Sequence, residues 1–264
     1  MTTSNGGWVA LFSGGKDASW ALHRALADGY DVRRLAIVRP PSPDHAYHTP
    51  APSVARLAAR SVGIPVVEVG VPVTDLEPPD VVASAVTADA ARDSRGADDD
   101  GAIEPLESAL RRLDDEFEDG LAGIVAGTVS SEHGVDRLRS MADGLGCAVH
   151  TPLWGADPRS LALAMIDGGL EIVIAEVTAP GFDASWLGRR LDREALSALE
   201  VLGRDHGVHL LGEGGEYETI VTDGPHMACP IELEFERVWE GTWGRLRITD
   251  ARLGTPATPD DGDG

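Results

Sequence analysis

The stretch Trp8-Val9-Ala10-Leu11-Phe12-Ser13-Gly14-Gly15-Lys16-Asp17 decides the fold that we expect for this chain. An apolar run comes first and breaks at a serine and two glycines, and a stretch rich in alanine and leucine then continues to Asp28-Gly29. This order predicts a buried strand, a tight loop and a helix that ends at a glycine. Backbone N–H groups at the start of a helix lack partners within the helix and bind anions. The sequence therefore predicts a phosphate-binding loop after the first strand.

Strand-like and helix-like runs alternate over the next part of the chain. Strand-like runs lie at 34–38, 66–71, 121–126 and 147–153, and helix-like stretches lie at about 52–62, 104–118 and 135–145. Such alternation is typical of an α/β fold, in which helices cover a parallel sheet and ligands bind at the carboxyl ends of the strands. We expect a sheet of this kind here.

The pattern changes after residue 154, where we expect a domain boundary. A helix at about 158–168, a strand at 170–177, a helix at about 192–206, a glycine-rich stretch and strands near 231–249 follow, which indicates a smaller α+β domain. We therefore predict an ATP-binding domain at 1–154 and a domain for the acceptor substrate at 155–250. Residues 251–264, rich in Thr, Pro, Asp and Gly, are predicted to be a disordered acidic tail.

The chain is strongly acidic. It has 44 Asp and Glu against 22 Lys and Arg, which gives a formal net charge of -22. Such a surface repels nucleic acid and anionic membranes, so we expect neither as a partner. At about 1 M salt the Debye length falls to about 3 Å, which screens most of the self-repulsion. We therefore expect a host that lives in high salt.

Lys16 in the phosphate loop is the only lysine among the 22 basic residues. Its compact ammonium group suits phosphate oxygens, and Gly14 and Gly15 allow the backbone to approach a phosphate closely. Asp17 suits a helix cap or the orientation of a magnesium ion. Neither the Walker A pattern GxxxxGK[ST] nor GxGxxG occurs in the chain. We expect ATP and Mg2+ at this loop.

Cys147 and Cys229 are isolated and form no CxxC pair, so we expect neither a disulfide framework nor a structural zinc site. The N-terminus has no basic and apolar signal region, and no apolar run approaches the roughly 20 residues that a membrane span needs. We therefore expect a soluble cytoplasmic protein. The sequence leaves the oligomeric state open.

Residues 8–23 resemble the SGGxDS motif of the N-type ATP pyrophosphatases, or PP-loop enzymes. The resemblance implies the fold of the adenine nucleotide alpha hydrolases and a reaction that splits ATP into AMP and pyrophosphate while an acceptor is adenylylated. The residues that it implies for ATP binding are Ser13, Gly14, Gly15, Lys16, Asp17 and Ser19, and Asp17 would also hold magnesium. The serine that follows the aspartate in the family is Ala18 here, so its phosphate contact is lost or displaced to Ser19.

The C-terminal half contains a dense motif at Gly212-Glu213-Gly214-Gly215-Glu216-Tyr217-Glu218-Thr219, called the octet below. Carboxylates and a tyrosine on a tightly folded, glycine-rich loop suit a cationic or amine-bearing substrate, and the alternative is an acidic hairpin turn on an acidic protein. The octet resembles the GEGGEYET signature of the diphthine–ammonia ligases, which complete diphthamide on translation elongation factor 2. Further segments similar to this family lie at 47–50, 150–154, 186–189 and 223–225.

The resemblance also implies roles for individual residues. Those expected to bind the substrate are Glu213, Gly214, Gly215, Glu216, Tyr217, Glu218, Thr219 and Arg137. We expect the three carboxylates of the octet to hold the trimethylammonium group of diphthine or the incoming ammonium, and the tyrosine to add a cation–π contact. We expect Glu216 to act in catalysis with Lys16 and Asp17, and His48 to contact ATP. Because the octet and the phosphate loop lie in different halves of the chain, about 200 residues apart, we expect the loop to bind ATP and the octet to serve the acceptor or ammonia.

The chain departs from the diphthine–ammonia ligase pattern after the fourth predicted strand. The family reads S-D-Y-Q-R-x-R there, and this chain keeps Ser131 and Arg137 but has Gly134 and Val135 in place of the glutamine and the first arginine. If this stretch contacts the acceptor substrate, then either the acceptor of this protein or the way the protein contacts it differs from that of the family.

Three functions are compatible with the sequence. The one we favour is amidation of diphthine on elongation factor 2 by ATP and free ammonia, with AMP and pyrophosphate as products, in a halophilic archaeon. A PP-loop enzyme that modifies tRNA would have a basic face and commonly paired cysteines, and this chain has neither. The third function is a nucleotide-binding regulatory module without catalysis, and Ala18 is the one feature that favours it.

Overall fold

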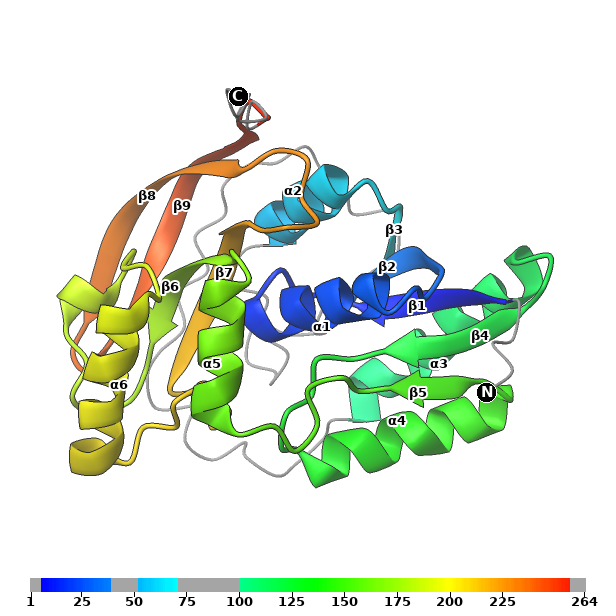
Figure 1. The fold of residues 1–264 in the computed structure, drawn as a ribbon, viewed down its shortest axis with the longest axis horizontal. Coiled ribbons are helices and arrows are strands. Elements are labelled where there is room, and N and C mark those ends of the chain that lie inside the picture. Colours follow the sequence, from blue (N-terminus) through cyan, green and yellow to red (C-terminus); the bar gives the residue numbers. More distant parts are fainter. Residues whose placement is uncertain (1–5, 39–51, 71–99, 257–264) are drawn as a thin grey trace, which may run out of the picture.

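The computed structural model describes residues 6–38, 52–70 and 100–256. Its N-terminal part is a five-stranded parallel sheet in the order β3-β2-β1-β4-β5 (Figure 1). The strands are β1 (Gly7–Leu11), β2 (Val32–Val38), β3 (Val66–Val69), β4 (Leu121–Val125) and β5 (Ala148–His150). The helices are α1 (Lys16–Ala27), α2 (Pro52–Val62), α3 (Asp100–Glu116) and α4 (Glu132–Leu145). The α/β fold expected from the sequence is confirmed.

Side chains of this sheet alternate between two hydrophobic cores. Val9 and Ile124 pack in one core with α3 and α4, whereas their neighbours Ala10 and Val125 pack in the other with α1 and α2. Successive residues of a strand point to opposite faces, so both faces of the sheet are covered. Every residue of β4 is buried, as expected for a parallel strand between two layers of helices.

The order of the strands creates a switch point beside β1. The chain runs from β1 to β2 and β3 on one side, and then crosses to β4 and β5 on the other side. In open α/β sheets, ligands bind at the carboxyl ends of the two strands that flank such a point. The carboxyl ends of β1 and β4 therefore mark the expected site.

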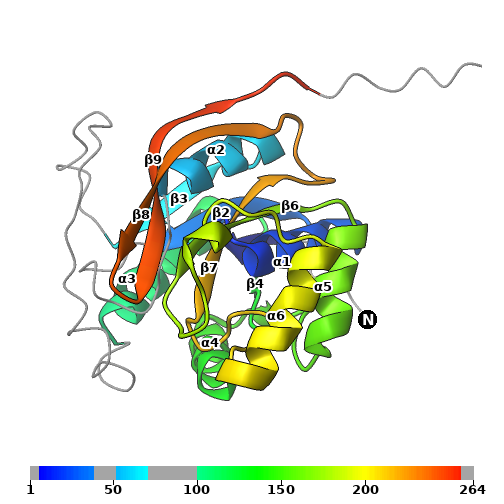
Figure 2. The ribbon, with the colours of Figure 1, turned by 90° about the vertical axis from the view of Figure 1, so that its left-hand side faces the viewer.

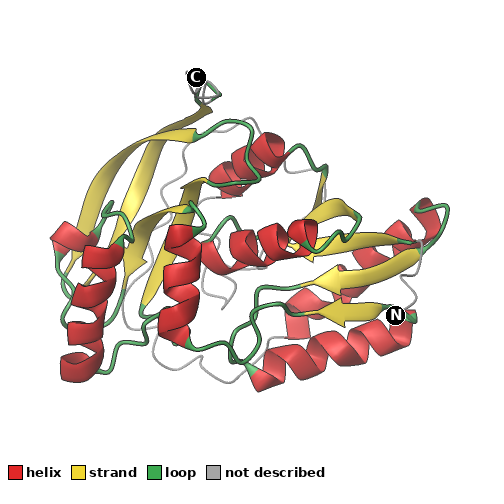
Figure 3. Cartoon of the chain, in the orientation of Figure 1, coloured by secondary structure: helices red, strands yellow, loops and turns green. Residues whose placement is uncertain are grey.

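The C-terminal part is a four-stranded antiparallel sheet in the order β7-β6-β9-β8 (Figures 2 and 3). Its strands are β6 (Glu171–Val177), β7 (Tyr217–Asp223), β8 (Ile231–Glu240) and β9 (Trp243–Leu253). Its helices are α5 (Pro158–Asp167), α6 (Arg193–His206) and the short 3-10 helix η2 (Ala184–Trp186). Strands β8 and β9 form a long hairpin that turns at Gly241, whose φ of 61° favours glycine.

Two expectations for this part are wrong. Strand β7 occupies residues 217–223, which the sequence analysis assigned to a glycine-rich stretch, because the β-branched run that starts at Thr219 was obscured by the glycines before it. Strand β9 continues to Leu253, beyond the expected end at residue 250, because Ala251 and Leu253 pair with Leu233 and Ile231 of β8. Residues 257–264 of the predicted tail lie outside the described residues.

The two sheets are joined by a shared hydrophobic core that contains residues of α1, α5, α6, β6 and β7. Trp20 of α1 packs closely on Gly168 at the end of α5, since a Cβ on that glycine would lie 2.3 Å from the indole ring. The predicted boundary near residue 154 falls between β5 and α5, and the division into domains stays a prediction. In the part of the chain that the structure describes, no helix is long and apolar enough to span a membrane.

Candidate functional site

The phosphate loop lies between the carboxyl end of β1 and the first turn of α1. Gly14 has a φ of 78°, and a Cβ at this position would lie 3.1 Å from the Cα of Ala55 in α2. Gly15 is the residue that caps α1 and has no side chain to accept the N–H groups of the first turn. The loop therefore presents backbone donors at a helix N-terminus, an arrangement that binds phosphate.

Strand β4 approaches the same loop from the other side of the switch point. A Cβ on Gly127, just after β4, would lie 2.6 Å from the carbonyl carbon and oxygen of Asp17. Only glycine allows this close approach of two backbones. The loop thus occupies the position where open α/β sheets bind their ligands.

The octet lies directly against the phosphate loop. The backbone N–H of Lys16 donates to Oγ1 of Thr219 at 3.2 Å, and the N–H of Val221 donates to the carbonyl of Gly14 at 2.9 Å. Strand β7, which begins inside the octet, is therefore hydrogen-bonded to the loop. The fold thus brings together motifs that are about 200 positions apart in the sequence.

Lys16 is buried between the two motifs. Its side chain is 5% exposed, its Nζ lies 2.7 Å from Oδ2 of Asp17, and the same Nζ lies 5.4 Å from the ring centre of Tyr217. Burial by itself lowers the pKa of Lys16, but the carboxylate of Asp17, then Tyr217 and Glu218, outweigh it and raise that pKa above its ordinary value. The ammonium group therefore stays charged.

Asp17 has one carboxylate oxygen paired and one unpaired. Oδ2 accepts from Lys16, whereas Oδ1 is buried and has no hydrogen-bond partner among the residues that the structure describes. A buried carboxylate oxygen without a donor fits a hard cation such as Mg2+. The described ranges contain no group of three or more His, Cys, Asp or Glu that could hold a metal. A magnesium ion bound here would therefore have one protein carboxylate as a ligand, and phosphate oxygens and water would supply the others.

Two carboxyl groups of the octet have raised pKa values. Glu218 pairs across strands with Glu176, and burial raises the pKa of Glu218 to about 7, helped by Glu176 and Asp17 and opposed by Lys16. Burial of the Glu213 carboxyl and the charge of Asp17 raise its pKa as well, although Ser130 donates to its Oε2 at 3.2 Å. A cation bound beside such carboxyl groups would stabilise their ionised form.

Tyr217 and Glu216 both make contacts within the protein itself. Tyr217 is buried, its hydroxyl donates to the carbonyl of Leu210 at 2.7 Å, and the cation over its ring is Lys16. Glu216 accepts the N–H of His209 on Oε1 at 3.1 Å and the N–H of Gly214 on Oε2 at 2.9 Å. The ring therefore contacts the protein's own cation, and the carboxylate holds the backbone of its own loop.

The other predicted residues are placed as follows. Gly215 has a φ of 77°, and a Cβ on Gly214 would lie 2.6 Å from the Glu216 carboxylate. Ser19 is buried on α1. Arg137 lies on α4, where its Nη1 is 3.4 Å from Nε2 of His133. His48 lies outside the described residues.

Four residues at the site were missed by the sequence analysis: Gly127, Ser130, Thr178 and His209. Gly127 and Ser130 follow β4, and the rule that ligands bind at the carboxyl ends of parallel strands could have found them. Thr178 follows β6, where its hydroxyl donates to the carbonyl of Gly215 at 2.6 Å. No sequence signal marked Thr178 or His209, because their contacts depend on how the octet folds.

Comparisons with known proteins give a consistent result. A family model described as "Diphthamide synthase N-terminal domain" matches residues 7–82, and one described as "Diphthamide synthase C-terminal domain" matches residues 157–253. A protein from Danio rerio named diphthine–ammonia ligase is 30% identical over 227 residues, which cover 82% of this chain and 82% of that protein. The protein of the same name from Homo sapiens is 26% identical over 239 residues, or 87% of this chain and 84% of that protein.

One solved structure also aligns with the chain. It is described as a predicted subunit of tRNA methyltransferase from Methanocaldococcus jannaschii, and the alignment covers 81% of this chain and 95% of that chain. The identity is 16% and the TM-score is 0.39.

Proposed function

This chain belongs to the diphthine–ammonia ligase (diphthamide synthase) family, and we propose that it uses ATP and free ammonia to amidate diphthine on translation elongation factor 2. The observation that carries this proposal is the hydrogen bond from Lys16 to Thr219, because it joins a phosphate-binding loop to a loop rich in carboxylates. An amide-forming ligase needs both: one part binds the nucleotide and the other binds the cationic substrates.

In the proposed reaction the carboxylate of diphthine attacks the α-phosphorus of ATP, and the bond to pyrophosphate breaks. Ammonia then attacks the activated carbonyl carbon, AMP leaves with the bonding electrons, and the nitrogen gives up a proton. Both steps move negative charge onto phosphate oxygens. Fixed donors that face the developing charge stabilise it more than water does.

The phosphate loop supplies those donors. The backbone N–H groups that follow Lys16 at the start of α1, together with the buried ammonium of Lys16, would hold the departing pyrophosphate. Gly14 and Gly15 would let the phosphates approach the backbone, with Ser13 and Ser19 as further proposed contacts. Magnesium, when bound to Oδ1 of Asp17, would neutralise phosphate charge as a Lewis acid.

The octet would bind the cationic partners of the reaction. Glu213 and Glu218 have raised pKa values, so a trimethylammonium or an ammonium ion beside them relieves the repulsion between carboxylates. Gly214, Gly215, Glu216 and Thr219 would shape this loop. We also propose that Arg137 on α4 contacts elongation factor 2 and that His48 contacts ATP.

A reaction on a translation factor takes place in the cytoplasm, and the acidic surface makes nucleic acid an unfavourable partner.

The test is incubation with ATP, ammonium and the host's diphthine-bearing elongation factor 2 in molar salt. We expect AMP, pyrophosphate and an amide on the factor, read by mass measurement. Controls lack ammonium or use a factor without diphthine, and both should give no amide. ATP binding without release of pyrophosphate would support a regulatory module instead, and activity on tRNA would support a tRNA-modifying enzyme.

A further inference from the structure

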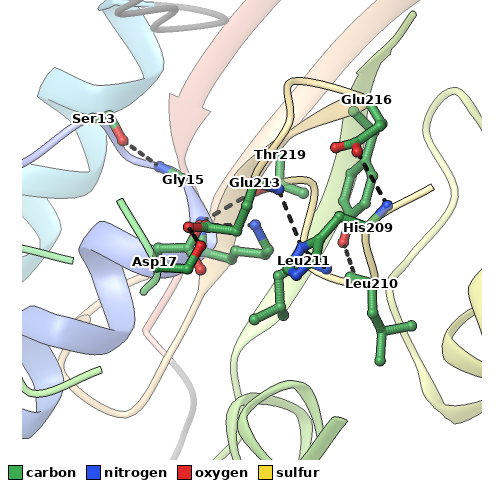
Figure 4. A network of polar contacts seen from close by, with 12 residues as sticks. Ser13, Gly15, Asp17, His209, Leu210, Leu211, Glu213, Glu216 and Thr219 are labelled. Carbon is green, nitrogen blue, oxygen red and sulfur yellow. Dashed lines mark hydrogen bonds and ion pairs between the residues drawn. The ribbon is translucent and has the colours of Figure 1, made fainter. Parts of the chain in front are cut away.

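His209 organises the loop that carries the first part of the octet (Figure 4). Its Nδ1 accepts the backbone N–H of Leu211 at 3.3 Å and that of Glu213 at 3.4 Å. Its backbone carbonyl accepts a third N–H, that of Gly212, at 2.9 Å. One residue thus holds the first half of the loop through both its side chain and its backbone.

Glu216 holds the same loop from the other end. Its carboxylate accepts the N–H of His209 and the N–H of Gly214, so it ties the start of the loop to its middle. Thr178 joins the loop to the end of β6, because its N–H donates to the carbonyl of Glu216 at 2.9 Å and its hydroxyl donates to that of Gly215. The loop is therefore fixed by side chains at both ends and by a neighbouring strand.

These bonds determine where Glu213 lies. The N–H of Glu213 is bound to His209, and the N–H of the next residue is bound to Glu216. From this fixed backbone the Glu213 side chain extends toward Asp17 (Figure 4) and accepts the hydroxyl of Ser130. A shift of the loop would move the Glu213 carboxylate away from both.

The scaffold also determines the tautomer of His209. A ring nitrogen that accepts two N–H groups carries no proton, so the proton of the neutral ring lies on Nε2. A residue that replaces His209 must therefore put an acceptor at the position of Nδ1. This requirement distinguishes replacement side chains that have similar polarity but carry their acceptor atom at different positions.

We propose that His209 is a positioning residue for amidation: by accepting the N–H groups of Leu211 and Glu213, it places the Glu213 carboxylate beside Asp17. The inference rests on the proposed function for the task of Glu213, but its geometric basis is independent of it. A misplacement of about 1 Å in an active site costs up to about 100-fold in rate. The loop bonds of His209 are of the kind that prevent such a shift.

Two amide variants distinguish this role from a general effect on polarity. Asparagine carries its acceptor oxygen on Cγ, the atom that bears Nδ1 in histidine, whereas glutamine carries it one carbon further, at the level of Nε2. We expect His209→Asn to amidate within about 3-fold of the wild type, and His209→Gln and His209→Leu to be slower by about 10- to 100-fold. The midpoint of thermal unfolding, measured for all three, identifies any variant that fails to fold.

Amide hydrogen exchange gives a readout that does not need activity. In His209→Asn, the N–H groups of Leu211 and Glu213 should keep their protection, and in His209→Gln they should lose it, while the N–H of Ile124 in β4 stays protected in both. If the wild type amidates nothing but the two variants differ in this way, the proposed function fails and the placement of Glu213 by His209 stands. Equal exchange in folded His209→Asn and His209→Gln overturns the proposal, and so does equal amidation by the two variants where the wild type amidates.

Discussion

The backbone N–H of Lys16 donates a hydrogen bond to Oγ1 of Thr219 at 3.2 Å, although the two residues are 203 positions apart. Both residues are buried, at 4% and 3% exposure, so water cannot replace this bond. The bond connects the first turn of α1 to the first residues of β7. The conformation of the phosphate loop therefore depends on the strand that continues the octet.

The first prediction removes the acceptor of this bond. Thr219→Val keeps the shape of the side chain but leaves the N–H of Lys16 buried without a partner, at a cost of about 1 to 3 kcal/mol. We expect weaker ATP binding and slower release of pyrophosphate. Thr219→Ser keeps the hydroxyl and should stay close to the wild type. ATP affinity, measured by calorimetry, should separate the two variants. Equal affinity would show that this hydrogen bond does not support ATP binding.

Lys16 is the subject of the second prediction. Lys16→Met should abolish release of pyrophosphate, because it removes the buried charge that faces the phosphates. Lys16→Arg should also be poor, since a planar guanidinium does not fit the space of an ammonium held between Asp17 and Tyr217. Circular dichroism checks that both variants fold. Near-normal pyrophosphate release by Lys16→Met would contradict the assigned phosphate site.

Local patterns predicted much of the fold. The apolar run before Ser13, the glycines of the loop and the stop at Gly29 depend on neighbours in sequence, and β1 and α1 follow them closely. Strand β7 was not predicted, because its short β-branched run directly follows a glycine-rich stretch. Propensity over a few residues is weak compared with pairing to a neighbouring strand, and β6 provides that pairing here.

The composition of the candidate site was easier to predict than its geometry. The loop and the octet were identified from their residue types, but their contact depends on the antiparallel sheet packing against α1, a long-range arrangement that no local pattern encodes. The same is true for Glu216, which the sequence analysis assigned to a cationic substrate and whose carboxylate accepts two N–H groups of its own loop. Hydrogen bonds to the backbone of a folded loop leave no trace in residue type alone.

A third prediction concerns the stability of the fold against pH. Burial, with Glu176 and Asp17, raises the pKa of Glu218 from 4.5 to about 7 against the attraction of Lys16. The native state therefore holds this proton more tightly than the unfolded state, and the stability so gained is lost as the pH rises from 4.5 through 7. Glu218→Gln cannot ionise and escapes this loss. Its free energy of unfolding, relative to that of the wild type, should rise by about 1 to 3 kcal/mol between pH 4.5 and pH 8.

Urea unfolding at the two pH values, in the same salt, measures this difference. Glu118→Gln is a matched control, because Glu118 is exposed in the turn between α3 and β4. If the stability of Glu218→Gln relative to the wild type is the same at both pH values, the surroundings of the Glu218 carboxyl do not raise its pKa.

The fourth prediction follows from the net charge of -22. Screening at high salt weakens exposed ion pairs such as those of Arg252 with Glu232 and Asp250, which contribute little to stability because they are exposed to solvent. It also removes the repulsion among the excess carboxylates, which acts over the whole surface. We expect the second effect to win, so that the free energy of unfolding rises between about 0.1 and 2 M potassium chloride.

Chemical denaturation at several salt concentrations tests this expectation. The gain should be steepest below about 1 M and level off above it, where the Debye length is about 3 Å, whereas stabilisation by an excluded solute such as sucrose continues to grow with concentration. A free energy of unfolding that stays constant or falls with salt would remove the argument for a halophilic host and leave the site unaffected.

The last prediction concerns the sign of the charge that Glu213 contributes. Its carboxylate lies near Asp17, in a site that is proposed to bind both a polyanion, ATP, and a cation, ammonium. A negative charge there opposes the first ligand and attracts the second. Replacing it by a neutral side chain of the same shape should therefore change the two affinities in opposite directions. Loss of loop structure, in contrast, would weaken both.

We expect Glu213→Gln to raise the KM for ammonium about 3- to 10-fold, while the affinity for ATP stays equal or improves slightly, because the carboxylate is only partly buried and part of its field is screened by solvent. Glu118→Gln makes the same change of charge at the amino end of β4, the edge of the sheet opposite to the site, and should change neither value. Amidation rates at several ammonium concentrations, with ATP affinity measured separately, decide the outcome. Weaker binding of both ligands would make Glu213 a structural residue of the octet, and an unchanged KM for ammonium would exclude it from the cation site.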